Sequence, residues 1–293
     1  MQARAFGDEA RRPHHSALER SVGRSRLLTR RIKSEREASS AADRKFVGAL
    51  GRGLDVLRCF GPRDPWLANQ DIAARTGLAR PTISRLTYTL TRLGFLRHSE
   101  SRRKYALGAA AVGLGYSALA QVDIRRSARP LLHALSQHTN SSVHLAINDE
   151  LNMQVLDTYW HSAVFVIDIG SRVPVATTSL GRAYVCALPE DERKVMLERI
   201  RAKRPAKWPN TRRRFEEAFR DYQRYGFCLA LGDWRREVNA VAAPLDPGDG
   251  TKPVVIGCSG AAFQLPPELL RHDIGPRLVA LIGNLRSTLS RQE

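Results

Sequence analysis

The sequence predicts an α+β protein with two domains, a small helical domain followed by a larger one built on an antiparallel sheet. The chain has 293 residues, of which 43% are apolar, which is enough for two hydrophobic cores. Helical periodicity dominates residues 46–93. Residues 141–170 and 227–263 hold consecutive strand-like runs, with helical patterns grouped between them, which is typical of an α+β arrangement.

Residues 1–44 are predicted to be a basic, disordered tail. They are rich in Arg, Ser, Ala and Glu and show no sustained apolar periodicity, so they cannot bury enough surface to fold. The tail could lie along the phosphates of a nucleic acid. It could equally be a solvated extension, or the product of a start codon placed too early.

Three helices are predicted next. In FVGALGRGLDVLRCF, helical spacing places four apolar side chains on one face, Leu50, Leu54, Leu57 and Phe60. A second helix fits residues 69–75, with Asn69 as its N-cap. Gly77 provides a turn, and Pro81 suits the first positions of a third helix that runs to about Leu93.

Two strand-like runs, about residues 95–98 and 104–107, follow the third helix and are joined by a polar turn. Together with the helices they form a winged helix-turn-helix, and we predict that this domain spans residues 45–108. The hairpin, or wing, carries four basic side chains, Arg97, Arg102, Arg103 and Lys104.

The third helix has a face suited to double-stranded DNA. Apolar side chains of the second and third helices can turn inward together, namely Ile72, Ala73, Leu78, Ile83, Leu86, Leu90 and Leu93. The outer face then offers hydroxyls and arginines but no acidic side chain, and its candidate DNA contacts are Arg80, Thr82, Ser84, Arg85, Thr87 and Tyr88. We predict that this face and the wing bind operator DNA. The alternative is a helical hairpin with a merely solvated basic face.

The charge of the chain also indicates a polyanionic partner. Its formal net charge is +18 and its pI is about 10.6. Residues 46–124 hold 11 Lys/Arg against 5 Asp/Glu and residues 125–293 hold 24 against 18, so the net positive charge per residue is about twice as high in the smaller part. The sequence has no apolar run of membrane-spanning length and no signal peptide, so we expect a cytoplasmic protein without a membrane partner.

Neither a metal site nor a cofactor is predicted. The cysteines form no C-x-x-C pair and have no His at zinc-ligand spacing. Scattered histidines such as His133, His138 and His144 are expected on the surface or as hydrogen-bonded core residues. The sequence also lacks a phosphate-binding Gly-rich loop and a nucleophile elbow.

A helix rich in Ala and Leu is predicted to link the domains over residues 109–124, and the second domain to span residues 125–293. It begins with a helix in RPLLHALSQHTN and strands in SSVHLAIN, NMQVLDTYW and AVFVIDIG. Helices in LGRAYVCAL, EDERKVMLERI and RRRFEEAFRDYQRYG precede strands in FCLALGD, VNAVAAPL and KPVVIGCSGAAF. A final amphipathic helix covers about residues 267–289.

The sequence resembles the isocitrate-lyase-regulator (IclR) family of bacterial transcription factors over about residues 47–289. The resemblance rests on ALGRGLDVLRCF, IAARTGLARPTISRLTYTLTRLGFL, the wing ending KYALG, SLGRAYVCAL and VNAVAAPL. It implies a winged-helix domain, a linker helix that dimerises, and a GAF-like C-terminal domain that binds a small effector. It also implies a homodimer or homotetramer that binds operator DNA.

The resemblance further implies an effector pocket, with candidates Ser179, Leu180, Gly181, Val238, Ala240, Gly257 and Ser259. Thr177, Thr178 and Ser179 stand where a helix starts, whose free amides could bind a carboxylate, although these hydroxyls could also merely cap the helix. Asp233 and Trp234 could add a polar contact and an aromatic wall, or Trp234 could be an ordinary core residue. A small organic acid, for example an aromatic one, is the expected effector.

The predicted function is therefore a ligand-responsive transcriptional regulator and not an enzyme. An enzyme with a DNA-binding appendage is one alternative, but Cys186 and Cys258 lie in apolar runs without an adjacent His, as buried structural cysteines do. A general architectural DNA binder is another alternative, which would leave the second domain without a role.

Overall fold

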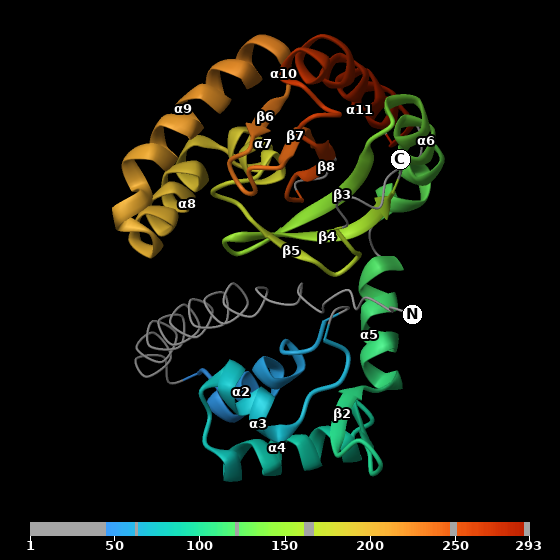
Figure 1. Ribbon diagram of the computed structural model, residues 1–293, viewed down its shortest axis with the longest axis vertical. Helices are drawn as coiled ribbons and strands as arrows, with labels where there is room; N and C mark the ends of the chain where they lie inside the picture. The colour runs from blue at the N-terminus through green and yellow to red at the C-terminus, as the bar shows by residue number, and fades with distance from the viewer. Residues whose placement is uncertain (1–44, 62–63, 121–122, 161–166, 247–250, 290–293) are drawn as a thin grey trace, which may run out of the picture. The chain divides into compact units, whose positions relative to one another are not determined.

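The computed structural model describes residues 45–61, 64–120, 123–160, 167–246 and 251–289 (Figure 1). The chain divides into two compact units, Met1–Gly115 and Tyr116–Glu293, called the N-terminal and C-terminal units below. The predicted tail, residues 1–44, lies outside the described residues.

The N-terminal unit is a winged helix-turn-helix, as predicted. Its described elements are, in chain order, α2 (Gly48–Leu57), α3 (Asn69–Thr76), α4 (Arg80–Arg92), β1 (Leu96–Ser99) and β2 (Lys104–Leu107), and α5 (Ala109–Ala120) spans the boundary between the two units. The strands β1 and β2 pair antiparallel to form the wing, and Leu67 adds a backbone bridge to Tyr105 of β2. The helices and the wing pack on a small shared core, whose buried residues are Val56, Leu67, Ile72, Ile83, Leu90 and Leu96.

The turn between α3 and α4 depends on Gly77. Its φ of 68° lies in the left-handed region, which glycine adopts without steric cost, and its N–H donates to the carbonyl of Ala73 at 2.8 Å. Pro81 lies in the first turn of α4, as predicted. The predicted N-cap of α3 is wrong, because Asn69 is already helical and Asp71 accepts the N–H of the true N-cap, Ala68, at 2.9 Å.

The apolar face predicted for α2 is also partly wrong. Leu50 and Leu54 are 62% and 48% exposed, whereas Gly53 and Val56 are buried. This helix carries apolar side chains on more than one side, so their spacing does not fix which side faces the core. Leu93 is likewise 61% exposed, because it caps the C-terminus of α4 instead of lying within the helix.

The C-terminal unit is built on an antiparallel six-stranded sheet with the order β5-β4-β3-β8-β7-β6 (Figure 1). Its strands are β3 (Ser142–Asp149), β4 (Asn152–Tyr159), β5 (Arg172–Pro174), β6 (Cys228–Leu231), β7 (Val238–Leu245) and β8 (Val254–Ala261). Its helices are α6 (Asp123–Thr139), α7 (Ser179–Ala187), α8 (Glu190–Lys203), η1 (Pro205–Lys207), α9 (Trp208–Tyr225), α10 (Pro267–Leu269), η2 (Leu270–Ile274) and α11 (Gly275–Leu289).

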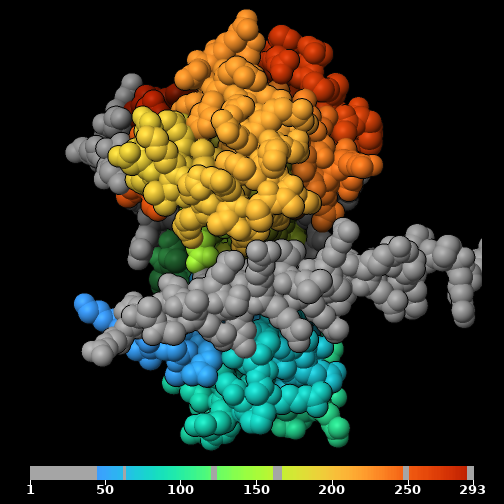
Figure 2. Space-filling model, turned by 90° about the vertical axis from the view of Figure 1, so that its left-hand side faces the viewer, coloured from blue at the N-terminus to red at the C-terminus, as the bar shows by residue number. Residues whose placement is uncertain are grey.

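Helices cover both faces of this sheet, and the alternation along its strands explains how. On β8, Ile256 and Cys258 belong to a core shared with α6 and α11, whereas Val255 belongs to a core shared with α7, α8 and α9. Residues two apart in a strand point to the same face, so Gly257 and Ser259 lie on the α7 side. Figure 2 shows α8 and α9, in yellow and orange, forming an outer surface of this unit.

Three element predictions differ from the structure. The expected strand in AVFVIDIG is not seen over residues 167–170, and residues 163–166 lie outside the described residues; the strand at this sheet edge is β5. The linker expected to reach residue 124 ends earlier, because Ile124 already belongs to α6 and its core. The final helix is interrupted by the π-helical turn η2.

Candidate DNA-binding surface and effector pocket

The outer face of α4 is polar and basic, as the sequence predicts. Arg80, Ser84, Arg85 and Tyr88 are exposed, and Thr82 is half-buried. The side chain of Tyr88 is notably free of the core, with 67% of the residue exposed. Arginine, hydroxyl and phenol groups on one helix face can reach base edges and phosphates in a major groove.

Thr87 is the exception on this helix and corrects the sequence prediction. It is fully buried, and its hydroxyl lies 2.9 Å from the carbonyl of Ile83 and 3.4 Å from the amide oxygen of Asn69 on α3. A threonine can satisfy its hydroxyl by bonding back to the preceding helical turn, so a polar side chain here does not require solvent. Thr87 therefore holds α3 and α4 together and is not available to DNA.

The wing presents its basic residues to solvent. Arg97, Arg102 and Arg103 are exposed and Lys104 is half-buried. Arg103 has a φ of 49° at the tip, where its N–H donates to the carbonyl of Glu100 at 3.3 Å. The carboxylate of Glu100 is 97% exposed and lies 3.4 Å from Nδ1 of His98. Basic side chains on such a hairpin are suited to phosphate contacts beside the groove that α4 would enter.

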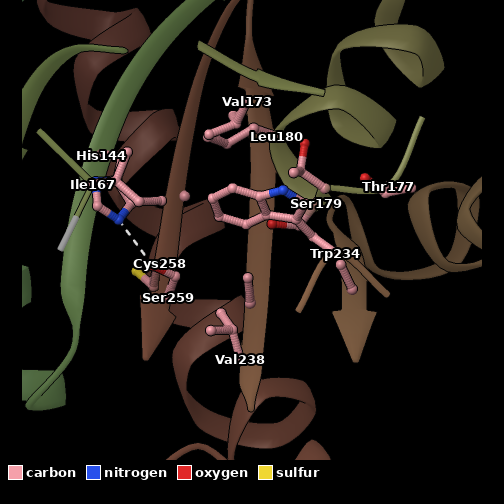
Figure 3. Close-up of a pocket in the computed structure, with 14 residues that line it drawn as sticks. His144, Ile167, Val173, Thr177, Ser179, Leu180, Trp234, Val238, Cys258 and Ser259 are labelled. Carbon is pink, nitrogen blue, oxygen red and sulfur yellow. Dashed lines mark hydrogen bonds between the residues drawn. The ribbon is translucent and has the colours of Figure 1, made fainter. Parts of the chain in front are cut away.

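A pocket opens in the C-terminal unit between the sheet and the start of α7 (Figure 3). The empty space within it, part of which is open to solvent, is about 420 Å³. Its lining residues are His144, Ile167, Val173, Thr177, Thr178, Ser179, Leu180, Ala230, Trp234, Val238, Ala240, Gly257, Cys258 and Ser259. None of these carries a positively charged side chain, apart from the titratable His144.

Small side chains on neighbouring strands leave room for this pocket. Ala230 of β6 pairs with Ala240 of β7, and Ala240 pairs with Ser259 of β8. Gly257 lies directly opposite His144 of β3, and a Cβ there would meet Leu180 Cδ2 at 2.9 Å. The floor of the pocket is therefore a strip of residues with little or no side chain, which runs across the sheet on the α7 side.

The start of α7 forms the polar wall of the pocket. Thr178 is the N-cap: its hydroxyl accepts the N–H of Gly181 at 3.1 Å and donates to the carbonyl of Pro174 at 2.7 Å. The hydroxyl oxygen of Thr177 is buried and has no hydrogen-bond partner among the described residues. Ser179 and Leu180 supply the first two amides of the helix, where the positive end of its dipole lies.

His144 closes the other side of the pocket as a buried, neutral imidazole. Its Nδ1 lies 2.7 Å from the Thr158 hydroxyl, and its Nε2 lies 2.8 Å from the Ser259 hydroxyl, the bond drawn in Figure 3. Burial lowers the pKa of His144 from 6.5 to about 4, because the charged form would lose its hydration. The ring therefore fixes the orientation of Ser259 at the pocket without adding charge to it.

This buried histidine should make the stability of the C-terminal unit depend on pH. In the unfolded chain His144 binds a proton below about pH 6.5, whereas in the folded chain it binds one only below about pH 4. The free energy of unfolding should therefore fall as the pH falls from 6.5 to 4. The slope should approach about 1.4 kcal/mol per pH unit. Denaturant titrations of wild type and His144→Gln between these pH values check this. Equal slopes in the two proteins would contradict it.

Trp234 lines the pocket, but its neighbour Asp233 does not, which corrects the predicted effector contact. Asp233 Oδ2 accepts from Arg182 Nη1 at 2.9 Å, and its Oδ1 lies 3.0 Å from Arg214 Nε. Arg182 is buried and also donates to the carbonyl of Leu229 at 2.8 Å. Asp233 thus anchors the loop that carries Trp234 to α7 and α9.

Gly181 is the second predicted pocket residue that the structure places elsewhere. A Cβ on Gly181 would lie 2.2 Å from the backbone of Val175, so the glycine lets α7 approach the segment after β5. The other seven predicted residues all line the pocket. Sequence reasoning missed His144, Ile167, Val173, Ala230 and Cys258 as lining residues. Side chains alternate between the two faces of the sheet along SSVHLAIN. Had the pocket-facing side of this strand been assigned, the alternation would have placed His144 in the pocket.

Two family models match the chain, one for each unit. The IclR helix-turn-helix domain matches residues 49–100, within the N-terminal unit. The bacterial transcriptional regulator IclR C-terminal domain matches residues 116–266, which is about half of the chain.

Individual relatives agree with these matches. The chain is 32% identical to the HTH-type transcriptional regulator TsaQ1/TsaQ2 of Comamonas testosteroni, over 83% of this chain and 89% of that protein. It is 25% identical to the Pca regulon regulatory protein of Pseudomonas putida, over 86% of this chain and 87% of that protein. The crystal structure of an IclR family transcriptional regulator from Brucella abortus is 45% identical, with a TM-score of 0.73, over 84% of this chain and 94% of that one.

Proposed function

Because the chain belongs to the IclR family and is a DNA-binding transcriptional regulator, we propose that its affinity for operator DNA is controlled by a small organic acid that binds at the start of α7. One observation carries the proposal: a pocket with apolar walls ends at hydroxyls and helix amides, and the described residues that line it include no lysine or arginine. We assign the DNA contacts to residues 45–108 and the effector contacts to the residues from α6 onward, with α5 (Ala109–Ala120) as the link.

On the DNA side, α4 enters the major groove and the wing contacts the flanking phosphates. Arg80, Ser84, Arg85 and Tyr88 are exposed on the helix, with Thr82 at its edge. Arginine is the residue best suited to read guanine through O6 and N7, so Arg85, in the middle of this face, is the main candidate for base readout. The wing arginines position the domain without reading sequence.

On the effector side, the acid places its carboxylate at the free amides of Ser179 and Leu180 and beside the Thr177 hydroxyl. A helix N-terminus with unpaired donors binds anions even without a cationic side chain. The remainder of the ligand lies between Trp234, Val173 and Leu180, where a flat apolar body such as an aromatic ring would be covered. Ser259, oriented by His144, can bond a polar substituent at the far end.

The regulator acts as a homodimer or homotetramer on a partly palindromic operator. Apolar side chains that a monomer would leave in water support this, since Leu50 and Leu54 on α2 and Val112 and Leu114 on α5 are between 48% and 69% exposed. The effector changes DNA binding only if it prefers one arrangement of the two DNA-binding heads.

The described helices are all too short or too polar to traverse a lipid bilayer. Since its proposed partner is chromosomal DNA, we place its action in the cytoplasm.

Ligand-induced thermal stabilisation tests the effector pocket. Benzoate and 4-hydroxybenzoate, used as trial acids at about 100 times their dissociation constants, should raise the free energy of unfolding by about 2.7 kcal/mol. Benzamide, which has the same ring without the charge, should have little effect. Ser179→Leu should abolish the shift while duplex DNA binding persists, and Ser287→Leu, exposed on α11, should leave it unchanged.

Two outcomes would count against this assignment. Equal stabilisation by benzamide and benzoate would show that the start of α7 does not select an anion. Retention of the full shift by a folded Ser179→Leu protein would place the ligand elsewhere.

A further inference from the structure

Trp66 lies against the wing although it stands three positions before Asn69, the first residue of α3. Its neighbour Leu67 is fixed to β2 by two backbone hydrogen bonds, since the Leu67 N–H donates to the Tyr105 carbonyl at 2.9 Å and the Tyr105 N–H donates back at 2.8 Å. Leu67 itself is buried in the core of the N-terminal unit. The backbone beside Trp66 is therefore held against β2 by a single isolated β-bridge.

Two wing arginines lie over the indole ring. The guanidinium carbon of Arg97, from β1, is 4.7 Å from the ring centroid, and that of Arg102, from the turn, is 4.9 Å away. Both distances are within the range of an attractive cation–π contact, and Trp is the strongest aromatic partner for a cation. Trp66 thus brings together two positive charges that would otherwise repel and move independently.

A guanidinium that stacks on an aromatic ring keeps its hydrogen-bonding edge free. Its five N–H donors lie in the plane of the group, whereas the ring occupies one of its flat faces. Arg97 and Arg102 can therefore contact Trp66 and donate to phosphate oxygens at the same time. Without such a support, each long side chain would have to be ordered when DNA binds, which weakens association.

We propose that Trp66 is a positioning residue that holds Arg97 and Arg102 ready for the DNA backbone before DNA arrives. This inference rests on the proposed contact between the wing and DNA. Trp66 acts through the arginines and makes no contact with bases. It should therefore raise affinity for all duplexes alike and leave sequence preference to α4.

The test uses the full chain and a duplex of arbitrary sequence, about 30 base pairs long, at about 50 mM salt, because phosphate contacts do not depend on sequence. Trp66→Leu should weaken binding by about tenfold, the cost of ordering two arginines on association. Trp66→Phe, which keeps a weaker aromatic face, should lose less. The slope of log affinity against log salt should not change in Trp66→Leu, because both arginines still reach phosphates.

A double-mutant cycle separates positioning from other roles. In the background Arg97→Gln/Arg102→Gln, the salt slope should fall by about 2, and adding Trp66→Leu should then change affinity by less than about twofold. A persistent tenfold loss in that background would overturn the inference, because Trp66 would then act on the fold or touch DNA itself. Tighter binding by Trp66→Leu would also overturn it, since the arginines would have to leave the ring to bind.

The outcomes also distinguish this inference from the proposed function. If Arg97→Gln/Arg102→Gln binds the duplex like wild type, neither arginine contacts DNA, so their proposed phosphate contacts and the role of Trp66 both fail. If that variant binds weakly but Trp66→Leu binds normally, the wing contact stands and only the role of Trp66 is wrong. Thermal unfolding of each variant confirms that the N-terminal unit remains folded.

Discussion

Asp233→Asn is expected to lower the free energy of unfolding of the C-terminal unit by about 3 to 5 kcal/mol. The substitution preserves the size of the side chain but removes the charge that pairs with Arg182 at 2.9 Å. The side chains of Arg182 and Asp233 are only 4% and 11% exposed, so the guanidinium would stay buried without its counter-charge. Denaturant unfolding followed by circular dichroism measures the loss.

Two matched variants show whether burial is the cause. Glu216→Gln removes a carboxylate that pairs with Arg212 at 2.8 Å in solvent, where the side chains are 51% and 68% exposed, and it should cost no more than about 0.5 kcal/mol. Arg182→Met/Asp233→Leu removes both charges and should recover part of the stability lost in Asp233→Asn. A cost for Asp233→Asn as small as that for Glu216→Gln would contradict the role given to this pair.

The second large effect is expected at the DNA surface. Arg85→Ala should weaken operator binding by about 1 to 3 kcal/mol and relax the preference at the base it reads. Arg103→Ala, at the tip of the wing, should weaken all sequences similarly and reduce the salt slope by about 1. Anisotropy titrations with the operator and with singly substituted operators at several salt concentrations distinguish the two.

Arg126→Ala is a suitable control for these titrations. Arg126 is exposed on α6 of the C-terminal unit, and its loss changes the net charge of the chain by the same amount. It should affect operator affinity much less than Arg85→Ala. If Arg85→Ala and Arg103→Ala both bind like wild type, α4 and the wing do not meet DNA in the way proposed.

The order of elements in the N-terminal unit could be predicted from sequence because local chemistry specifies it. Gly77 marks the turn by its left-handed φ, Pro81 marks the start of α4, and the polar turn after Ser99 marks the wing. The identity of buried positions was harder to predict. Thr87 looked like a surface residue because it is polar, but its hydroxyl is satisfied inside the helix pair.

The phase of α2 could not be read because Leu50 and Leu54 compete with Val56 for the core, and only the packing of α3 and α4 decides between them. In an oligomer these leucines would be covered, which is consistent with the assembly proposed above. A pattern of apolar residues thus identifies what must be buried, but not whether the same chain or another copy buries it.

For the pocket, the resemblance to the IclR family predicted more of the lining residues than the residue chemistry alone did. It pointed to Ser179, Val238, Ala240 and Ser259, all of which line the pocket. Asp233 was misassigned because an acidic residue next to a pocket aromatic has the same sequence signature whether it faces a ligand or a buried arginine. Its partner Arg182 is 51 positions away, so only the three-dimensional structure brings them together.

Base reading by α4 in a symmetric assembly is tested most directly by selection of duplexes from a random-sequence pool with the purified full chain. A regulator that reads DNA with α4 in a symmetric assembly should enrich two related half-sites separated by about one helical turn or a multiple of it. Under the same conditions Arg85→Ala should enrich a more degenerate sequence. Enrichment of no common sequence by wild type, or of the same sequence by both proteins, would contradict a base-reading role for α4.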